Sequence, residues 1–86
     1  MPELSRFFGI VIRMYWDDHN PPHFHAFYAG EQAIIDINSL TIIGGDLSPR
    51  ALGLVVEWAT LHRRELLADW HRAQRQEPLE KIEPLR

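Results

Sequence analysis

Apolar and polar positions divide the first half of the chain into short segments typical of β-strands. Residues 7–16 (FFGIVIRMYW) are rich in aromatic and β-branched types, which favour extended backbone. Residues 23–29 (HFHAFYA) follow a break that contains two prolines, and residues 32–37 (QAIIDI) follow a tight turn at Gly30. Residues 41–45 (TIIGG) predict a short fourth strand. We therefore expect three or four antiparallel strands over about residues 7–43.

The second half of the chain has the pattern of one long helix. Ser48 and Pro49 favour a helix start, because serine caps free backbone N–H groups and proline suits the first helical position. No further proline occurs before Pro78, so the pattern predicts a helix over about residues 49–74. Such a helix is about 39 Å long, whereas a domain of this size is about 31 Å across. Its last turns must therefore project, bend or rest on a partner, and the proline-containing residues 77–86 predict an extended tail.

Together these elements predict a single α+β domain over residues 1–86. Its three- to four-stranded antiparallel sheet is followed by one long C-terminal helix packed on one face. Because side chains alternate along a strand, the apolar set that includes Phe24 should face this helix. The opposite face, away from the helix, should then collect Arg13, Tyr15, His23, His25 and Asp36.

The predicted helix is apolar on two sides. At 100° per residue, one stripe should cover the sheet, and Leu54, Trp58 and Leu61 fall on the opposite side. Tryptophan is a favoured anchor at interfaces, so this second patch predicts a protein partner or a homodimer bound through the helix. The alternative is that the tail folds back over the patch. The stripe expected to cover the sheet consists of Leu52, Val55, Val56, Ala59, Leu66 and Trp70.

Composition limits the classes of function. Apolar residues make up 45% and charged residues 24%, which is typical of a globular protein. The chain has no cysteine, so disulfides and thiolate metal sites are excluded. The net charge of −3 argues against a large non-specific nucleic-acid surface, although RNA could still bind a small basic face. The apolar run 7–12 is too short to span a membrane, so we expect a cytoplasmic protein that does not bind membranes.

Residues 17–26 (DDHNPPHFHA) concentrate the candidate chemistry, since they hold three of the five histidines. One interpretation is a purely structural polar turn built from aspartate, asparagine and proline. A second is a metal site, because His23 and His25 share one strand face and Asp17, Asp18 or His19 could complete the ligand shell. We expect no cofactor, with a divalent transition metal as the alternative.

A third interpretation is acid–base or phosphate chemistry. Histidine can transfer a proton near neutral pH, and Arg13 could hold a phosphate meanwhile. Tyr15 and Phe27 could stack on RNA bases. No serine or cysteine nucleophile is suitably placed, so cleavage would use the RNA's own hydroxyl or a water. The resulting hypothesis is a small metal-independent ribonuclease that uses His23, His25 and Arg13.

Four segments of the chain resemble a widespread bacterial family catalogued only as a domain of unknown function. They are SRFFGIVIRMYWDDHNPPHFHA, AIIDI, RALGLVVEWATLHRREL and KIEPL, and they cover nearly the whole chain. The resemblance implies a short stand-alone bacterial protein, often encoded beside a second short protein as in toxin–antitoxin pairs, without an assigned reaction. The signature that it implies consists of Asp18, His19, Pro21, Pro22, His23 and His25.

The predicted function is therefore a partner-binding component of a toxin–antitoxin-like gene pair. The ribonuclease and a metal-binding protein that uses the two histidines are the alternatives. The residues predicted to take part in binding are Tyr15, Asp18, His19, Asp36, Leu54, Trp58 and Leu61.

Overall fold

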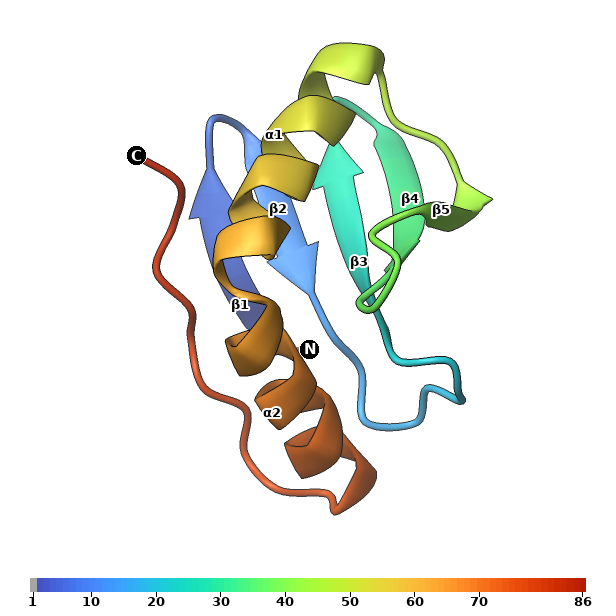
Figure 1. Ribbon diagram of the computed structural model, residues 1–86, viewed down its shortest axis with the longest axis vertical. Coiled ribbons are helices and arrows are strands. Elements are labelled where there is room, and N and C mark those ends of the chain that lie inside the picture. Colours follow the sequence, from blue (N-terminus) through green and yellow to red (C-terminus); the bar gives the residue numbers. More distant parts are fainter. Residues whose placement is uncertain (1) are drawn as a thin grey trace.

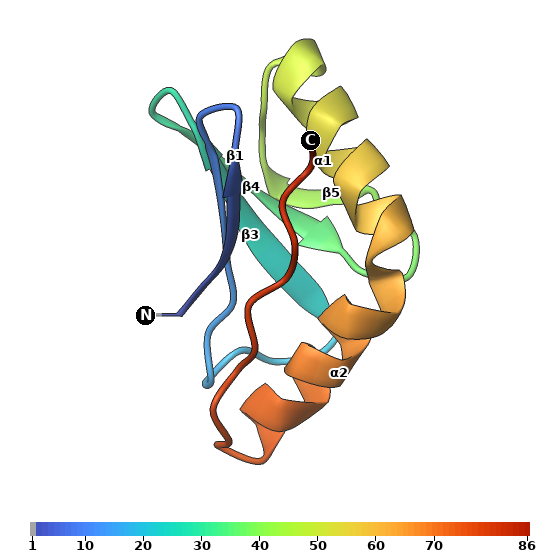
Figure 2. The ribbon, with the colours of Figure 1, turned by 90° about the vertical axis from the view of Figure 1, so that its left-hand side faces the viewer.

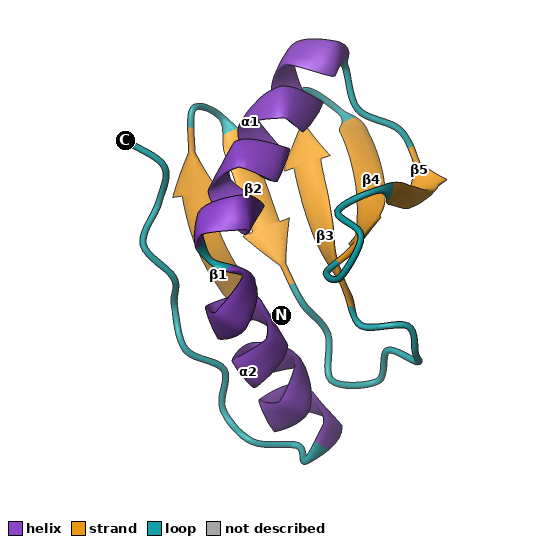
Figure 3. Cartoon of the chain, in the orientation of Figure 1, coloured by secondary structure: helices purple, strands orange, loops and turns teal. Residues whose placement is uncertain are grey.

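The computed structural model describes residues 2–86 and shows a five-stranded antiparallel sheet with two helices across one face (Figure 1, Figure 3). The α+β class is thus confirmed, whereas the predicted strand number is too low and the single helix is in fact two. The strands follow one another through the sheet in chain order. They are β1 (Glu3–Phe7), β2 (Ile10–Arg13), β3 (His23–Tyr28), β4 (Glu31–Asp36) and β5 (Ile42–Gly45), followed by α1 (Pro49–Leu61) and α2 (Arg63–Gln74).

The predicted first strand over residues 7–16 is wrong, because the chain reverses at Phe8 and Gly9. Both residues have positive φ angles, 49° and 82°, as in the two-residue hairpin turns that match the twist of paired strands. Phe7 and Ile10 therefore pair across the hairpin, and residues 3–7 form an additional strand. A non-glycine residue with positive φ is uncommon, so nothing in the apolar run FFGIVI predicted a turn there.

The predicted helix over residues 49–74 is interrupted at His62, whose φ of −123° and ψ of 23° are not helical. The resulting bend lets α1 and α2 follow the sheet and stay within a molecule that measures 33 × 25 × 22 Å (Figure 2). Arg63 begins α2 at this bend and donates its Nε to the carbonyl of Ile37, at 3.2 Å. Neither helix within residues 2–86 is long and apolar enough to cross a membrane.

The core lies between the inner face of the sheet and the two helices. Strand pairing places Ile12 opposite Ala26 and Phe24 opposite Ile35, and all four side chains are fully buried. Burying each large apolar side chain contributes about 1.5–3 kcal/mol to the free energy of unfolding. The largest fully buried apolar side chains are Trp58, Trp70, Phe24, Leu4, Ile10, Ile12, Met14, Ile35, Ile37, Leu66 and Val55.

Trp58 belongs to this core, so the expectation that it lies on the far side of the helix is wrong. Its side chain is 0% exposed, and its ring lies 5.4 Å from that of Phe7 and 5.9 Å from that of Phe24. The stripe of α1 that faces the sheet is rotated towards Trp58 and consists of Ala51, Val55, Trp58 and Ala59. Of the patch predicted on the far side, Leu54 is half-buried against the core and Leu61 is 67% exposed.

The tail folds back over the core, as the alternative interpretation of the helix patch proposed. Residues 77–86 run between the edge strand β1 and the helices (Figure 2). The indole of Trp58 donates a hydrogen bond to the carbonyl of Glu83 at 2.8 Å. The N–H of Ile82 donates to the carbonyl of Leu4 at 2.8 Å, and the Ile82 side chain is buried. The tail therefore closes the core and shields part of the exposed edge of β1.

Alanine substitution should have opposite effects on stability at two glycines, Gly53 and Gly45. Gly53 lies inside α1 with nothing near the position of an added Cβ, so Gly53→Ala should stabilise the protein by about 0.5–1 kcal/mol. At Gly45, φ is 69° and an added Cβ would lie 2.1 Å from the carbonyl oxygen of Gln32. Gly45→Ala should therefore destabilise the protein by on the order of 2 kcal/mol. Urea unfolding measures both, and equal effects at the two positions would contradict this account of β5.

Truncation of Ile82, the buried side chain of the tail, should lower the free energy of unfolding as much as truncation of a core residue does. Ile82→Ala should lower the free energy of unfolding by about 2–4 kcal/mol, because it leaves a cavity under the tail. The neighbouring Lys81 is exposed, so Lys81→Ala should change stability by no more than about 0.5 kcal/mol. Thermal and urea unfolding give both values. If the two variants are equally stable, the tail does not contribute to the core.

Candidate functional site

Strand β3 carries two different faces, and its outer face holds the two signature histidines. Phe24 and Ala26 point into the core, so His23 and His25 lie on the other face. Arg13 of β2 is the direct cross-strand partner of His25. The predicted common face of Arg13 and the histidines therefore agrees with the strand register.

The third member of the site, Asp18, comes from the connection between β2 and β3. The side chain of Gln74, at the end of α2, donates a hydrogen bond to the Asp18 carbonyl at 3.2 Å. The indole of Trp16 donates to the carbonyl of Glu77 at 2.9 Å, which joins the same connection to the start of the tail. These two contacts, between residues 61 and 56 positions apart in sequence, hold Asp18 beside β3.

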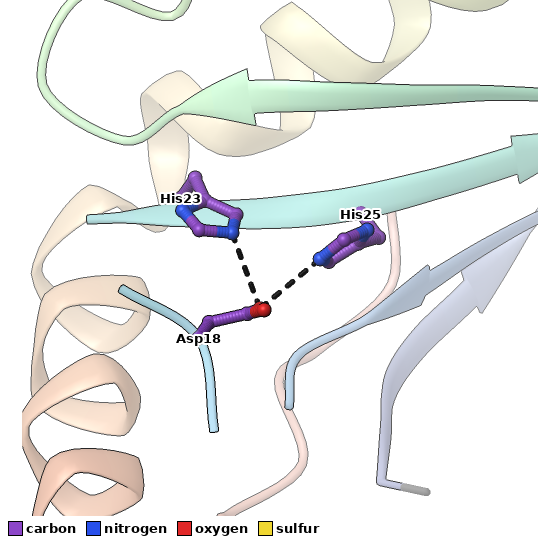
Figure 4. Close-up of side chains that lie close together, drawn as sticks. All are labelled: Asp18, His23 and His25. Atoms are coloured by element: carbon purple, nitrogen blue, oxygen red, sulfur yellow. Dashed lines mark hydrogen bonds and ion pairs between the residues drawn. The ribbon is translucent and has the colours of Figure 1, made fainter. Parts of the chain in front are cut away.

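One carboxylate oxygen of Asp18 contacts both histidines (Figure 4). Asp18 Oδ2 lies 3.2 Å from Nε2 of His23 and 3.1 Å from Nε2 of His25. The histidine side chains are 10% exposed and that of Asp18 is 23% exposed, so the site is shielded but reachable from solvent. The three residues can each offer one ligand atom, and these atoms lie within 4.8 Å of one another.

The hydrogen bond of His23 to the backbone decides which of its ring nitrogens carries hydrogen. Nδ1 lies 2.7 Å from the carbonyl oxygen of Pro21, and a carbonyl can only accept. Nδ1 must therefore donate, so in the neutral ring Nε2 presents a lone pair to Asp18 Oδ2, which is also an acceptor. Two acceptors at this distance repel each other unless a proton or a metal cation lies between them.

The second histidine has a weaker orienting contact. The amide Nε2 of Gln32 lies 3.4 Å from Nδ1 of His25. An amide nitrogen can only donate, so this contact leaves Nε2 of His25 as the nitrogen that donates to Asp18 in the neutral ring. A metal ion bound to Nε2 would displace that proton. The two histidines therefore face the same oxygen with different hydrogen-bonding roles.

Aromatic side chains enclose the two imidazole rings. The His23 ring lies 5.2 Å from that of Trp70 in α2, and the His25 ring meets that of Tyr15 edge to face at 4.6 Å. His23 was expected to lie away from the helix, and this expectation is wrong. The reason is that α2 continues beyond the end of β2 (Figure 1), and its residue Trp70 packs against the ring of His23 at the start of β3.

The remaining predicted residues lie outside this cluster. Asp17 and His19 are exposed in the same connection. Asp36 is the cross-strand partner of His23, but its Oδ1 accepts hydrogen bonds from the N–H groups of Asn38 and Ser39 at 2.7 and 3.0 Å. Its carboxylate thus stabilises the turn after β4. Leu54, Trp58 and Leu61 are on α1, where Trp58 is part of the core.

Sequence reasoning missed three residues that position the site, namely Gln32, Trp70 and Gln74. Gln32 lies on β4 and the other two lie on α2, and none of them belongs to a motif. Trp70 lies in the stripe that was expected to cover the sheet, but its contact with His23 depends on where α2 ends relative to β3. That position follows from the bend at His62, and the helix length left a bend open as an alternative without locating it.

A family model described as Domain of unknown function (DUF4160) matches residues 9–71. The chain belongs to this family. The matched DUF4160 segment includes Arg13, Asp18 and both histidines, but ends before the tail. No curated protein and no solved structure matches the chain. Membership in DUF4160 therefore confirms the resemblance and leaves the roles of Asp18, His23 and His25 to be inferred from their geometry.

Proposed function

We propose that this protein binds a divalent transition-metal ion, such as zinc, through Asp18 Oδ2 and the Nε2 atoms of His23 and His25. The observation that supports the proposal most strongly is the convergence of both imidazoles on one carboxylate oxygen. At His23 the metal would replace an unfavourable contact between two acceptors with two coordinate bonds. Imidazole nitrogen and carboxylate oxygen are common ligands of zinc and of its neighbours in the first transition series.

Two of the three distances between the ligand atoms are close to those of a tetrahedral zinc site. Zinc–nitrogen and zinc–oxygen bonds of about 2.0–2.2 Å put two ligands about 3.4 Å apart at the tetrahedral angle. The Nε2 atoms of His23 and His25 lie 3.2 and 3.1 Å from Asp18 Oδ2, and all three ligand atoms lie within 4.8 Å of one another. The bond from His23 Nδ1 to the Pro21 carbonyl is the kind of outer contact that orients metal-bound histidines.

The number of ligands is informative as well. Structural zinc sites usually have four protein ligands, whereas sites with three leave a position for water or a substrate. Within residues 2–86, one cluster of three metal-ligating side chains occurs, and it consists of Asp18, His23 and His25. The proposed site therefore has an open coordination position, which favours a reactive or ligand-binding metal over a purely structural one.

Metal-independent RNA cleavage is the second candidate function, and the pairing of Arg13 with His25 supports it. The convergence of Asp18 on both histidines gives it less support, because a carboxylate repels an approaching phosphate. A role in a toxin–antitoxin-like pair stays a prediction that depends on the family resemblance. For that role, the exposed Leu61 is the part of the predicted helix patch that supports contact with a partner.

Zinc titration of chelator-treated protein by calorimetry tests the metal proposal. The wild type should bind one zinc per chain, and His25→Ala or Asp18→Asn should weaken binding by about 100-fold or more. His71 is exposed on α2, so His71→Ala is the matched control and should bind as the wild type does. Absence of zinc binding, or equal binding by all four proteins, would overturn the proposal.

Thermal unfolding provides a second readout of the same prediction. A ligand that binds only the folded protein, at 100 times its dissociation constant, stabilises it by about 2.7 kcal/mol. For a domain of this size, zinc at that excess should raise Tm by on the order of 10 °C. The two ligand variants should show no such rise, while their Tm without metal establishes that they are folded.

RNA cleavage in the presence of a chelator separates the two candidate functions. If the histidines work on RNA without metal, the wild type cleaves single-stranded RNA in excess EDTA, and His25→Ala does not. We expect no cleavage under these conditions, because Asp18 directs both imidazoles towards a cation. Cleavage by the wild type that disappears in His25→Ala and in Arg13→Gln would instead establish the ribonuclease.

A further inference from the structure

Arg13 is a cation that lies beside the proposed metal site without forming an ion pair. It lies on β2 directly opposite His25, and its side chain is partly exposed. Its Nε is buried and has no hydrogen-bond partner, and none of the ion pairs within residues 2–86 involves Arg13. A shielded donor without an acceptor is unfavourable, so the guanidinium would gain from an acceptor that a ligand supplies.

The nearest candidate for a countercharge is engaged elsewhere. Glu3 of β1 is the cross-strand partner of Arg13, but its carboxylate accepts two hydrogen bonds from Arg6, at 2.7 and 3.2 Å. These bonds lower the pKa of Glu3 below its ordinary value. Arg6 is thus the ion-pair partner of Glu3, and the Glu3 carboxylate attracts Arg13 only at longer range. The N–H groups of Arg13 therefore stay available to a ligand.

The guanidinium of Arg13 is held in place by an aromatic ring. Its central carbon lies 5.4 Å from the centre of the Phe27 ring, which is a favourable cation–π distance. Phe27 follows His25 on the same face of β3, about 7 Å further along the strand. The proposed metal and the guanidinium therefore lie on either side of His25, on the outer face of the sheet.

We propose that Arg13 and the metal at Asp18, His23 and His25 together bind the terminal phosphate of a phosphate monoester. This inference depends on the metal proposal and adds the class of ligand. A phosphate monoester has three free oxygens, so one can coordinate the metal while two accept the parallel N–H groups of a guanidinium. A carboxylate has two oxygens and cannot satisfy both partners in this way. The monoester can be a small phosphorylated molecule or the phosphorylated end of an oligonucleotide.

Calorimetric titration of the zinc-loaded protein with phenyl phosphate tests the proposal. The wild type should bind it, and Arg13→Gln should weaken binding by about tenfold or more, because charge-assisted hydrogen bonds are lost. Arg13→Lys keeps the charge without the planar fork and should also bind more weakly than the wild type. Neither variant should bind zinc more weakly than the wild type, since Arg13 is not a metal ligand, and the Tm of each variant without metal establishes that it is folded.

Arg6 provides the matched control. It pairs with Val11 on the same face of the sheet, and Glu3 already neutralises it, so Arg6→Gln should bind phenyl phosphate as the wild type does. Dimethyl phosphate, a diester, should bind more weakly than phenyl phosphate. Short RNA with and without a 5′-phosphate then distinguishes the two sources, because only the phosphorylated end should depend on Arg13.

The zinc titration without phosphate separates the two possible failures. If zinc does not bind, the proposed function fails, and the joint phosphate site fails with it. If zinc binds but phenyl phosphate does not, or binds equally to wild type and Arg13→Gln, only the phosphate proposal is overturned. A loss of binding that is the same in Arg6→Gln and Arg13→Gln also overturns it, because the effect is then one of net charge.

Discussion

The alternation of side chains along β3 is the constraint on which both the fold and the candidate site depend. Phe24 and Ala26 are fully buried on the inner face, which fixes the register of β3 against Ile12 of β2 and Ile35 of β4. A shift by one residue would exchange the faces and bury the histidines in the core. The hydrophobic core therefore does more than stabilise the sheet: it fixes the direction in which the two imidazoles point.

The helices and the tail cover the inner face of the sheet, which explains why the candidate site lies on the outer face. Both helices and the tail pack on the inner side, where Trp58 and Ile82 are buried and their polar groups are hydrogen-bonded. The end of α2 extends beyond the sheet. There Gln74 donates a hydrogen bond to the Asp18 carbonyl, and Trp70 packs against the ring of His23. The site is thus supported by the inner layer at one end of β3 and open to ligands along the rest of the outer face.

Sequence alone predicted the parts of this structure that depend on periodicity. The strands near β3, β4 and β5, the helix start at Pro49 and the common face of Arg13 and His25 all follow from spacing and turn residues. The hairpin at Phe8 was missed, because phenylalanine seldom adopts a positive φ. A bend in the helix was one of the alternatives that its length left open, but no proline or glycine marks its position at His62. The sequence predicted His23 and His25 as a pair of metal ligands, but it left Asp17, Asp18 and His19 as alternatives for the third ligand. The selection of Asp18 depends on contacts with Gln74 and the tail, which lie more than 50 residues away in sequence.

Charge gives the metal and the arginine a common physical basis. Two neutral imidazoles and one carboxylate carry one negative charge, so a divalent cation would leave the site with one positive charge. Arg13 adds a second positive charge on the same face, and Glu3, which Arg6 already binds, attracts it only at longer range. Two like charges on one face of a partly shielded site repel each other. A dianionic phosphate relieves the repulsion by contacting both, and each cation then strengthens the binding of the other through the shared ligand. The metal-free protein, in contrast, presents the Asp18 carboxylate on this face, which would repel the same phosphate.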